Sequence, residues 1–432
     1  MSQTLAEKLL GSHALVDGRP TAAEAGRSVR AGAILEVSVD RVLANDVTAP
    51  VAIREFAKLG VDSVFDREAV VLVADHFTPN KDIASAEQCA TVRRFAAEQG
   101  LPHFYDVGRN GIEHVLLPEL GLVSPGSVVV GADSHACTYG ALGAFATGVG
   151  STDVAVAMAT GAAWMRVPES LRVEFEGRPA RWVGGKDLVL FLIGRIGVDG
   201  ARYQAIEFAG PAIDALPMSA RFTMANMAIE AGAKVGLFAV DDVTAAYLAA
   251  TGSCAKPAAL RPDPNATYVE RWTIDASALE PQIALPHSPG NVLPVRAAGH
   301  IPIDQVVIGS CTNGRLDDLR TAAEILRGRR VDAHVRCIVL PGSQRVMLEA
   351  TREGLVEVFL EAGAAIGPPT CGPCLGGHMG VLASGERAVS TTNRNFRGRM
   401  GDPRSEVYLA GPAVAAASAV AGCIVSPEEV AA

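Results

Sequence analysis

Three short apolar runs in this chain end directly in reactive side chains, and this pattern restricts the possible fold most. The runs cover residues 69–74, 127–130 and 305–308, and they lead into Asp75-His76, Asp133-Ser134-His135 and Cys311, respectively. Apolar runs that alternate with helical segments are typical of α/β proteins with mostly parallel sheets. Such sheets bind ligands beyond the carboxyl ends of their strands. The sequence therefore predicts an α/β fold whose site is built from these strand-end side chains.

The length of 432 residues suggests about three domains, at roughly 150 residues each. A new strand pattern begins at Arg172, and residues 286–292 (Pro-His-Ser-Pro-Gly-Asn-Val) are rich in turn formers and resemble a linker. We therefore expect domains at residues 1–167, 168–285 and 286–432.

The composition excludes several classes of protein. With 49% hydrophobic residues the chain has enough apolar material for several cores, so disorder is excluded. The net charge of −9 gives no general attraction to nucleic acids or anionic membranes. The stretches 136–165 and 409–425 are rich in Ala and Gly, and we expect buried helices or glycine-rich turns there, not membrane spans. No secretory signal opens the sequence, so a cytoplasmic location and reduced cysteines are expected.

Three of the eight cysteines have a suggestive spacing. Cys311 is followed after 59 residues by a Cys-Gly-Pro-Cys step at Cys371 and Cys374. Three thiolates leave one position of a metal centre open, as Lewis-acid catalysis requires, whereas closed zinc or iron–sulfur sites have four ligands. A CxxC step alone, however, is more often a redox pair or half of a zinc site, here completed by His378. The spacing leaves both alternatives open.

Five sequence motifs decide between these alternatives, because together and in this order the chain resembles the aconitase superfamily along nearly its whole length. The motifs are Ala74-Asp-His76, Asp133-Ser-His-Ala-Cys-Thr138, Gly309-Ser-Cys-Thr-Asn313, Cys371-Gly-Pro-Cys374 and Asn393-Arg-Asn-Phe-Arg-Gly-Arg399. Within the superfamily the chain is most similar to the large subunits of the enzymes that act on isopropylmalate or homoaconitate. The resemblance implies three α/β/α units packed around an iron–sulfur cluster, without the swivelling fourth domain of single-chain members.

The resemblance also implies the site residues. One [4Fe–4S] cluster per chain would be held by Cys311, Cys371 and Cys374, with the fourth iron open to substrate. Catalysis would fall to Asp75, His76, His114, Asp133, His135 and Glu230, and carboxylate binding to Arg394 and Arg399. Without the resemblance, Glu230 would be taken for a solvated helix residue and His114 for a structural histidine.

Physical chemistry supports these roles. An aspartate beside a histidine orients the ring and raises its basicity, so Asp75 and His76 suit the acid that protonates a departing hydroxyl. In an extended segment, Asp133 and His135 would point to the same side. The planar guanidinium groups of the two arginines match the carboxylates of a dicarboxylate or tricarboxylate substrate.

The expected activity is that of a hydro-lyase that isomerises 2- and 3-isopropylmalate by dehydration and rehydration, in leucine biosynthesis. The alternative is the same chemistry on homocitrate and homoaconitate in lysine biosynthesis. In single-chain members the swivelling domain carries the base, so we expect a separate small subunit to supply it in a heterodimer or a larger assembly. RNA binding, which some single-chain relatives perform, is disfavoured by the negative charge and by the lack of an aromatic and basic strip.

Overall fold

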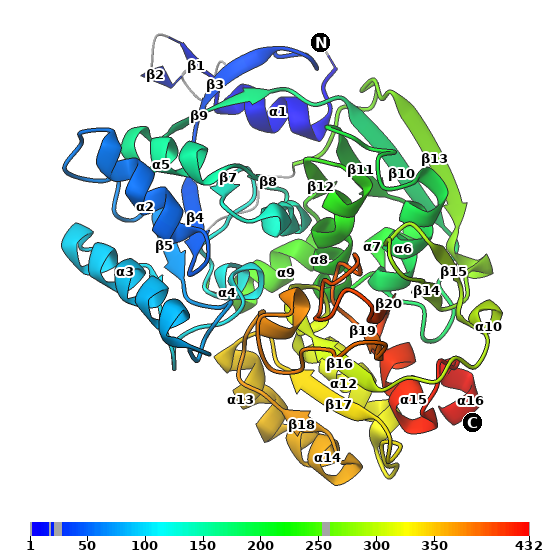
Figure 1. The fold of residues 1–432 in the computed structure, drawn as a ribbon. Helices are drawn as coiled ribbons and strands as arrows, with labels where there is room; N and C mark the ends of the chain where they lie inside the picture. Colours follow the sequence, from blue (N-terminus) through cyan, green and yellow to red (C-terminus); the bar gives the residue numbers. More distant parts are fainter. Residues whose placement is uncertain (1, 17–18, 21–27, 253–259, 432) are drawn as a thin grey trace.

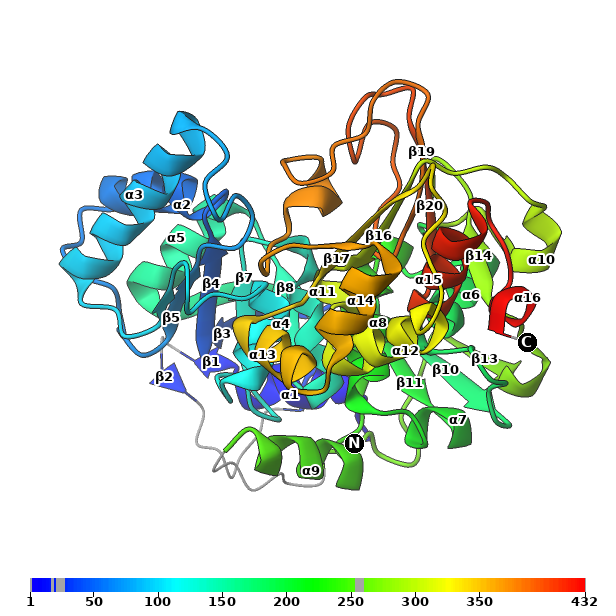
Figure 2. The ribbon, with the colours of Figure 1, turned by 90° about the horizontal axis from the view of Figure 1, so that it is seen from below.

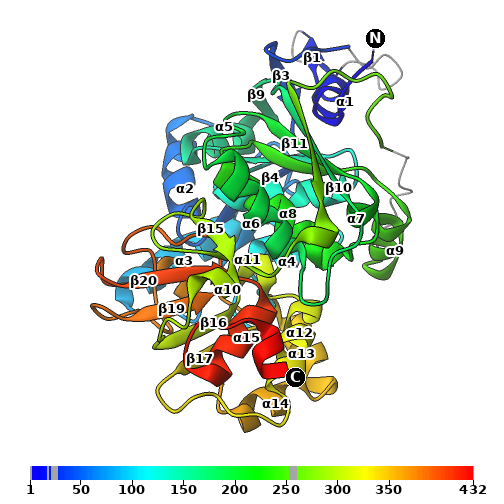
Figure 3. The same cartoon turned by 90° about the vertical axis from the view of Figure 1, so that its right-hand side faces the viewer.

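The predicted α/β fold is confirmed by a computed structural model, which describes residues 2–16, 19–20, 28–252 and 260–431. Three main sheets surround the centre of the molecule, and the two termini lie at opposite ends of it (Figures 1 and 3). The first sheet comes from the first 150 residues, the second from the middle of the chain and the third from the remainder.

The first sheet has five strands in the order β6-β5-β4-β7-β8, all parallel. The strands are β4 (Arg41–Asn45), β5 (Val70–Val73), β6 (Phe104–Tyr105), β7 (Val128–Gly131) and β8 (Phe145–Gly148). Every residue of β5 is buried, so both faces of this strand are covered. This burial explains why the strand reads as a continuous apolar run and not as an alternating pattern.

Helices complete the first unit. They are α1 (Leu5–Ser12), α2 (Ala49–Lys58), α3 (Ile83–Gln99), α4 (Glu113–Glu119) and α5 (Ser151–Thr160), and a separate two-stranded ribbon joins β3 (Ile34–Ser38) to β9 (Ala162–Arg166). The long helix α3 is preceded by its cap Asp82, whose side chain accepts the backbone N–H of Ser85, and is followed by Gly100 in the left-handed conformation. Both are ordinary helix boundary signals.

The second sheet is a parallel sheet of four strands in the order β12-β11-β10-β13. The strands are β10 (Ser170–Glu176), β11 (Ala205–Ala209), β12 (Val235–Phe238) and β13 (Glu270–Asp275). Helices α6 (Gly185–Ile196), α7 (Pro211–Asp214), α8 (Met218–Met227) and α9 (Asp242–Ala250) belong to this part of the chain, with the short 3-10 helix η3 (Ala228–Ala231) after α8.

The third sheet has seven strands in the order β15-β14-β20-β19-β16-β17-β18. Only β14 runs in the opposite direction to the other strands, because it pairs antiparallel with both β15 and β20. The strands are β14 (Gln282–Ala284), β15 (Val292–Pro294), β16 (Gln305–Gly309), β17 (Arg336–Leu340), β18 (Ala365–Ile366), β19 (Arg387–Ser390) and β20 (Glu406–Ala410). The helices are α10 (Val295–Ala298), α11 (Ser310–Asn313), α12 (Leu316–Leu326), α13 (Gln344–Arg352), α14 (Leu355–Ala362), α15 (Pro412–Ala421) and α16 (Pro427–Ala431).

The predicted linker at residues 286–292 is wrong. β14 and β15 pair with each other, and Leu285 N–H donates to Asn291 O at 2.8 Å, so this stretch is the loop of a β-hairpin in the third sheet. Turn-forming residues serve a hairpin loop as well as a linker, and composition alone does not separate the two. The division into domains 1–167, 168–285 and 286–432 stays a prediction, and β14 pairs with the third sheet although it precedes residue 286.

One apolar core spans the three sheets, since its buried members include Val71, Phe208 and Leu409. The long loops before and after β19 project together at the top of Figure 2, beside the gap that separates them from α2 and α3. The two Ala- and Gly-rich stretches fold into short elements, among them α5 and α15. In the described ranges, no helix has both the length and the apolar character that a membrane crossing needs.

Candidate active site

The carboxyl ends of the first and third sheets meet at one small, partly open cavity. Nine of the eleven predicted site residues line it: Asp75, His76, His114, Asp133, His135, Cys311, Cys371, Cys374 and Arg399. Asp75 follows β5, Asp133 follows β7, and Cys311 follows β16. The remaining two, Glu230 and Arg394, contact this group through His135 and through each other. The structure therefore brings all eleven residues together.

The three thiols are surrounded by hydrogen-bond donors. Asn226 and Asn393 each direct an amide N–H at Cys311 Sγ, at 3.2 and 3.3 Å, and Arg399 Nη2 lies 3.9 Å from Cys374 Sγ. A hydrogen bond from the Cys371 thiol holds the pKa of Cys311 well below its usual range. Thiolates are the form that binds metals, and donors to sulfur stabilise them. This donor set fits a thiolate-bound metal centre.

The spacing of the sulfurs argues against a single zinc ion. A zinc ion lies about 2.3 Å from each thiolate, so two of its thiolates are at most about 4.6 Å apart. Among the described residues, the groups of three whose ligand atoms all lie within 4.8 Å are Asp46-Asp75-His76 and Glu113-His114-Asp133, and the cysteine triad is not one of them. His378 does not complete the triad either, because its Nε2 contacts Thr370 Oγ1 and His76 O. At least one pair of the three sulfurs therefore lies farther apart than a single zinc ion can bridge.

Asp75 and His76 form the predicted pair. His76 Nδ1 donates to Asp75 Oδ1 at 2.7 Å, and both residues are held in the turn after β5. Burial lowers the pKa of His76, but the carboxylates of Asp75 and Asp46 outweigh it and raise the pKa well above its ordinary value. This shift favours the imidazolium form of the ring, and because Nδ1 is bonded to Asp75, Nε2 is the nitrogen left to donate a proton.

Asp133 links the two other histidines. Its Oδ1 accepts hydrogen bonds from His114 Nε2 at 2.8 Å and from His135 N–H at 2.7 Å. Burial opposes the ionisation of Asp133, but the two histidines hold its pKa well below the usual range. The segment after Asp133 is not extended, because Asp133 caps the 3-10 helix η2 (Ser134–Leu142). A capping aspartate folds its side chain back onto the helix, and this is why it meets the His135 amide.

Glu230 is buried, with 4% of its surface exposed, so it is not the solvated helix residue that its local sequence suggests. Its Oε1 accepts His135 Nε2 at 2.9 Å and Arg394 Nε at 2.8 Å. Burial and the Arg394 charge lower the pKa of His135, yet Asp133 and Glu230 raise it to about 9. Arg399 differs from Arg394, because its Nε is buried and has no hydrogen-bond partner within the described chain.

Four residues of the site were missed by sequence reasoning: Asp46, Glu113, Asn226 and Asn393. Asp46 follows the apolar strand β4, so the same strand-end rule would have found it.

Glu113 has only 1% exposure, and its Oε2 has no hydrogen-bond partner among the described residues. Burial and the nearby carboxylates of Asp75 and Asp133 raise the pKa of Glu113 well above its ordinary value. No sequence pattern signals a buried carboxyl of this kind within a helix.

Cys137 is fully buried and its thiol donates to the backbone carbonyl of Asn226 at 3.3 Å. Cys89, Cys337 and Cys423 lie outside the cavity lining. Cys254 lies outside the described residues. All described cysteines are free thiols.

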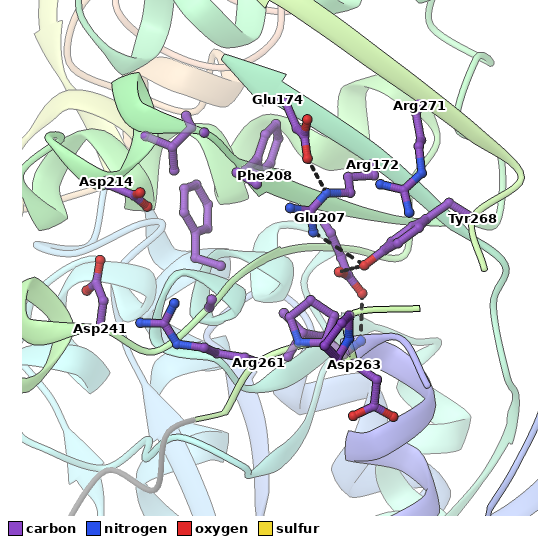
Figure 4. Close-up of a pocket in the computed structure, with 18 of the residues that line it drawn as sticks. Arg172, Glu174, Glu207, Phe208, Asp214, Asp241, Arg261, Asp263, Tyr268 and Arg271 are labelled. Carbon is purple, nitrogen blue, oxygen red and sulfur yellow. Dashed lines mark hydrogen bonds and ion pairs between the residues drawn. The ribbon is translucent and has the colours of Figure 1, made fainter. Parts of the chain in front are cut away.

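A more open pocket on the second sheet is a poorer candidate, because most of its charges are already paired (Figure 4). Arg172 Nε donates to Glu174 at 2.6 Å, and the hydroxyl of Tyr268 donates to Glu207 at 2.6 Å. The guanidinium groups of Arg172 and Arg271 both lie over the Tyr268 ring. Paired charges stabilise the fold and leave few groups for chemistry, whereas the cavity between the first and third sheets concentrates titratable groups.

Comparisons with known proteins agree with this geometry. Residues 15–422 match the model of the aconitase family (aconitate hydratase). A protein of Moorella thermoacetica named 3-isopropylmalate dehydratase large subunit is 60% identical, over all of this chain and all of its own. One of Pyrococcus furiosus, named 3-isopropylmalate dehydratase large subunit 1, is 58% identical over 99% of each chain. The solved structure of Thermococcus kodakaraensis aconitase X superposes with a TM-score of 0.51 at 15% identity, covering 86% of this chain and 88% of that one, and supports the fold. The chain therefore belongs to the aconitase family.

Proposed function

We propose that this chain is the large subunit of an iron–sulfur hydro-lyase that interconverts 2-isopropylmalate and 3-isopropylmalate by removing and adding back water. The observation that carries the proposal is the meeting of three thiols, an Asp–His pair and two further histidines at one cavity. Full-length identity of 55–60% to proteins named 3-isopropylmalate dehydratase large subunit supports the substrate.

Cys311, Cys371 and Cys374 would hold a [4Fe–4S] cluster through three thiolates. When bound, such a cluster supplies a Lewis acid at the iron that has no cysteine ligand. The amides of Asn226 and Asn393 and the guanidinium of Arg399 would stabilise the charge on the sulfurs, since hydrogen bonds to sulfur tune clusters of this type.

His76 would act as the acid of the dehydration. Its Nδ1 is fixed by Asp75, so Nε2 would give a proton to the departing hydroxyl oxygen and take it back when water adds. His114 and His135, whose side chain and backbone N–H respectively bond Asp133, would lie beside the water and the substrate hydroxyl and contribute positive charge there. A hydroxide is a poor leaving group, so proton delivery at this oxygen lowers the barrier.

Arg399 would bind a substrate carboxylate. Its Nε has no hydrogen-bond partner within the described chain, and a carboxylate oxygen would supply one. Arg394 shares Glu230 with His135 and would place its remaining N–H donors toward the second carboxylate. Arginine suits this task because its planar fork matches a carboxylate in two bonds.

A small subunit that carries the swivelling domain would complete the site. Among the described residues that line the cavity, no serine stands ready as a base for the proton beside the carboxylate. The relatives' name, large subunit, supports a second chain that supplies it. A cytoplasmic location is part of the proposal, since ligand thiols stay reduced in that compartment.

The test is to co-express the chain with its small subunit under anaerobic conditions and to assay both isopropylmalates and homoaconitate. The proposal expects a brown complex with four irons and four sulfides per large subunit, which turns over isopropylmalate and loses activity when either chain is omitted. Turnover of homoaconitate alone would assign the lysine-pathway substrate instead. A colourless complex with stoichiometric zinc would refute the cluster.

A further inference from the structure

The turn that carries His76 is held by a carboxylate on the neighbouring strand. Asp46 follows β4 and is completely buried. Its Oδ1 accepts the backbone N–H groups of Asp75 at 3.0 Å and His76 at 2.8 Å, and its Oδ2 accepts that of Phe77 at 2.8 Å. One carboxylate thus accepts hydrogen bonds from three consecutive backbone N–H groups just after the end of strand β5.

Three charge-assisted hydrogen bonds compensate the burial of this carboxylate. A buried charge without partners is strongly destabilising, and the three N–H donors replace the hydrogen bonds that water would make to an exposed carboxylate. The three donors would themselves be unpaired without Asp46, because the chain leaves the sheet after Val73. The geometry of the turn therefore depends on this residue.

The same turn also touches the segment with the cluster cysteines. The carbonyl of Asp75 accepts the N–H of Cys371 at 2.7 Å and the hydroxyl of Thr370 at 2.9 Å. A Cβ at Gly377 would lie 2.6 Å from the Phe77 ring, so that ring already packs closely on the loop after Cys374. Movement of the turn would shift His76 relative to the thiols.

We propose that Asp46 is a positioning residue of the reaction: it fixes the imidazole of His76 at a set distance from the cluster. Its Oδ1 also lies 3.9 Å from His76 Nδ1, so a second negative charge faces the nitrogen that Asp75 binds. This inference rests on the proposed hydro-lyase function. Asp46 does not line the cavity, and it acts only through the turn.

The test is Asp46→Asn in the reconstituted two-chain holoenzyme. Asparagine keeps one acceptor oxygen but turns an N–H toward at least one backbone donor, so the turn shifts while the shape of the side chain is retained. Displacement of a catalytic group by about 1 Å costs roughly 100-fold in rate. We expect kcat to fall by about that factor, with KM, iron and sulfide content unchanged.

Asp40 is the matched control, because it stands at the other end of the same strand. Its Oδ2 accepts the backbone N–H of Val128 at 2.7 Å and contacts His13 Nε2 at 2.9 Å, far from the cavity lining. Asp40→Asn should leave kcat unchanged. A purely structural role of Asp46 would instead lower cluster content or thermal stability together with activity.

A double-mutant cycle with His76→Ala separates positioning from a general structural effect. If Asp46 acts through His76, then Asp46→Asn has no further effect on kcat in the His76→Ala background. Additive losses, or an unchanged kcat in the single variant, would overturn the inference. If Asp46→Asn does not fold, Asp46→Glu, which keeps the charge and displaces it by one methylene, takes its place in the same cycle. The kcat of each variant is compared with that of the wild type on whichever substrate the wild-type enzyme turns over. A wrong substrate assignment therefore leaves this test intact.

Discussion

The imidazole of His135 and the carboxylate of Glu230 lie 2.9 Å apart, Nε2 to Oε1, although 95 positions separate them in the chain. His135 lies in η2, between β7 and β8 of the first sheet, whereas Glu230 lies in η3 beside the second sheet. Arg394, from the segment after β19 in the third sheet, donates to the same Oε1 at 2.8 Å. A single carboxylate oxygen therefore joins side chains from all three sheets beside the cavity.

Glu230→Gln should lower kcat/KM by about 100-fold or more. The substitution removes the carboxylate that the His135 ring and the partly buried Arg394 share, and displacement of a catalytic group by about 1 Å costs roughly 100-fold in rate. The measurement is steady-state kinetics of the two-chain enzyme, with cluster content checked by iron and sulfide analysis. Glu207→Gln is the control, since Glu207 is equally buried but bonds Tyr268 and the Leu5 amide in the pocket of Figure 4. Equal losses in both variants would contradict a specific role for Glu230.

Cys371→Ser should abolish the brown colour and the bound iron and sulfide after anaerobic reconstitution. A hydroxyl is a much weaker ligand than a thiolate for a cluster of this kind. Cys137→Ser should keep both, because a serine at that position still has a donor for the carbonyl of Asn226. Retention of a full cluster by the Cys371 variant would show that this thiol is not a ligand.

The strand-end positions were predictable from the sequence because they depend on local patterns. Continuous apolar runs marked β5, β7 and β16, and parallel strands place whatever follows them at one edge of a sheet. Glu230 and Arg394 were predicted only through the resemblance to the aconitase superfamily, because the sequence around each residue does not indicate a role in the site. Their meeting with His135 depends on how three sheets pack, and no spacing in the sequence encodes that packing.

Local patterns also account for the errors. The stretch at 286–292 contains the residues that both linkers and hairpin loops use, so the pairing of β14 with β15 decided its role. Asp46 was overlooked although it follows β4, because a short Asn-Asp step after a strand is usually only a turn. Its importance comes from the three N–H groups on the neighbouring strand's turn, which only the tertiary structure brings within reach.

Arg399→Lys should raise KM for the substrate by about tenfold to 100-fold, with a smaller effect on kcat. The buried Nε of Arg399 has no hydrogen-bond partner among the described residues, and a lysine has no planar fork to replace it. A hydrogen bond to a charged group contributes about 1.5–3 kcal/mol, which corresponds to that range. Arg397→Lys, at an exposed position two residues earlier, is the control and should leave KM unchanged. If both variants behave alike, Arg399 does not bind the carboxylate.

Glu119 predicts a pH dependence of stability that is separate from catalysis. Its Oε2 accepts the hydroxyl of Ser343 at 2.6 Å, and Ser343 caps α13, so this contact joins the first unit to the third. Burial, partly offset by Ser343, raises the pKa of Glu119 from 4.5 to about 7. The unfolded chain therefore loses this proton at a lower pH than the folded chain does. The contribution of Glu119 to the free energy of unfolding falls as the pH rises from about 4.5 to 7, by at most about 3 kcal/mol, and stays low above that range.

Glu119→Gln removes this titration while keeping an acceptor for Ser343. Relative to wild type, the variant should therefore gain stability between pH 5 and pH 8, as measured by the difference in melting temperature at the two pH values. Glu361→Gln, at an exposed glutamate on α14, should show no such change. A Glu119 variant whose difference from wild type is the same at both pH values would mean that this carboxyl is ionised in the folded protein throughout, and that its burial does not shift its titration.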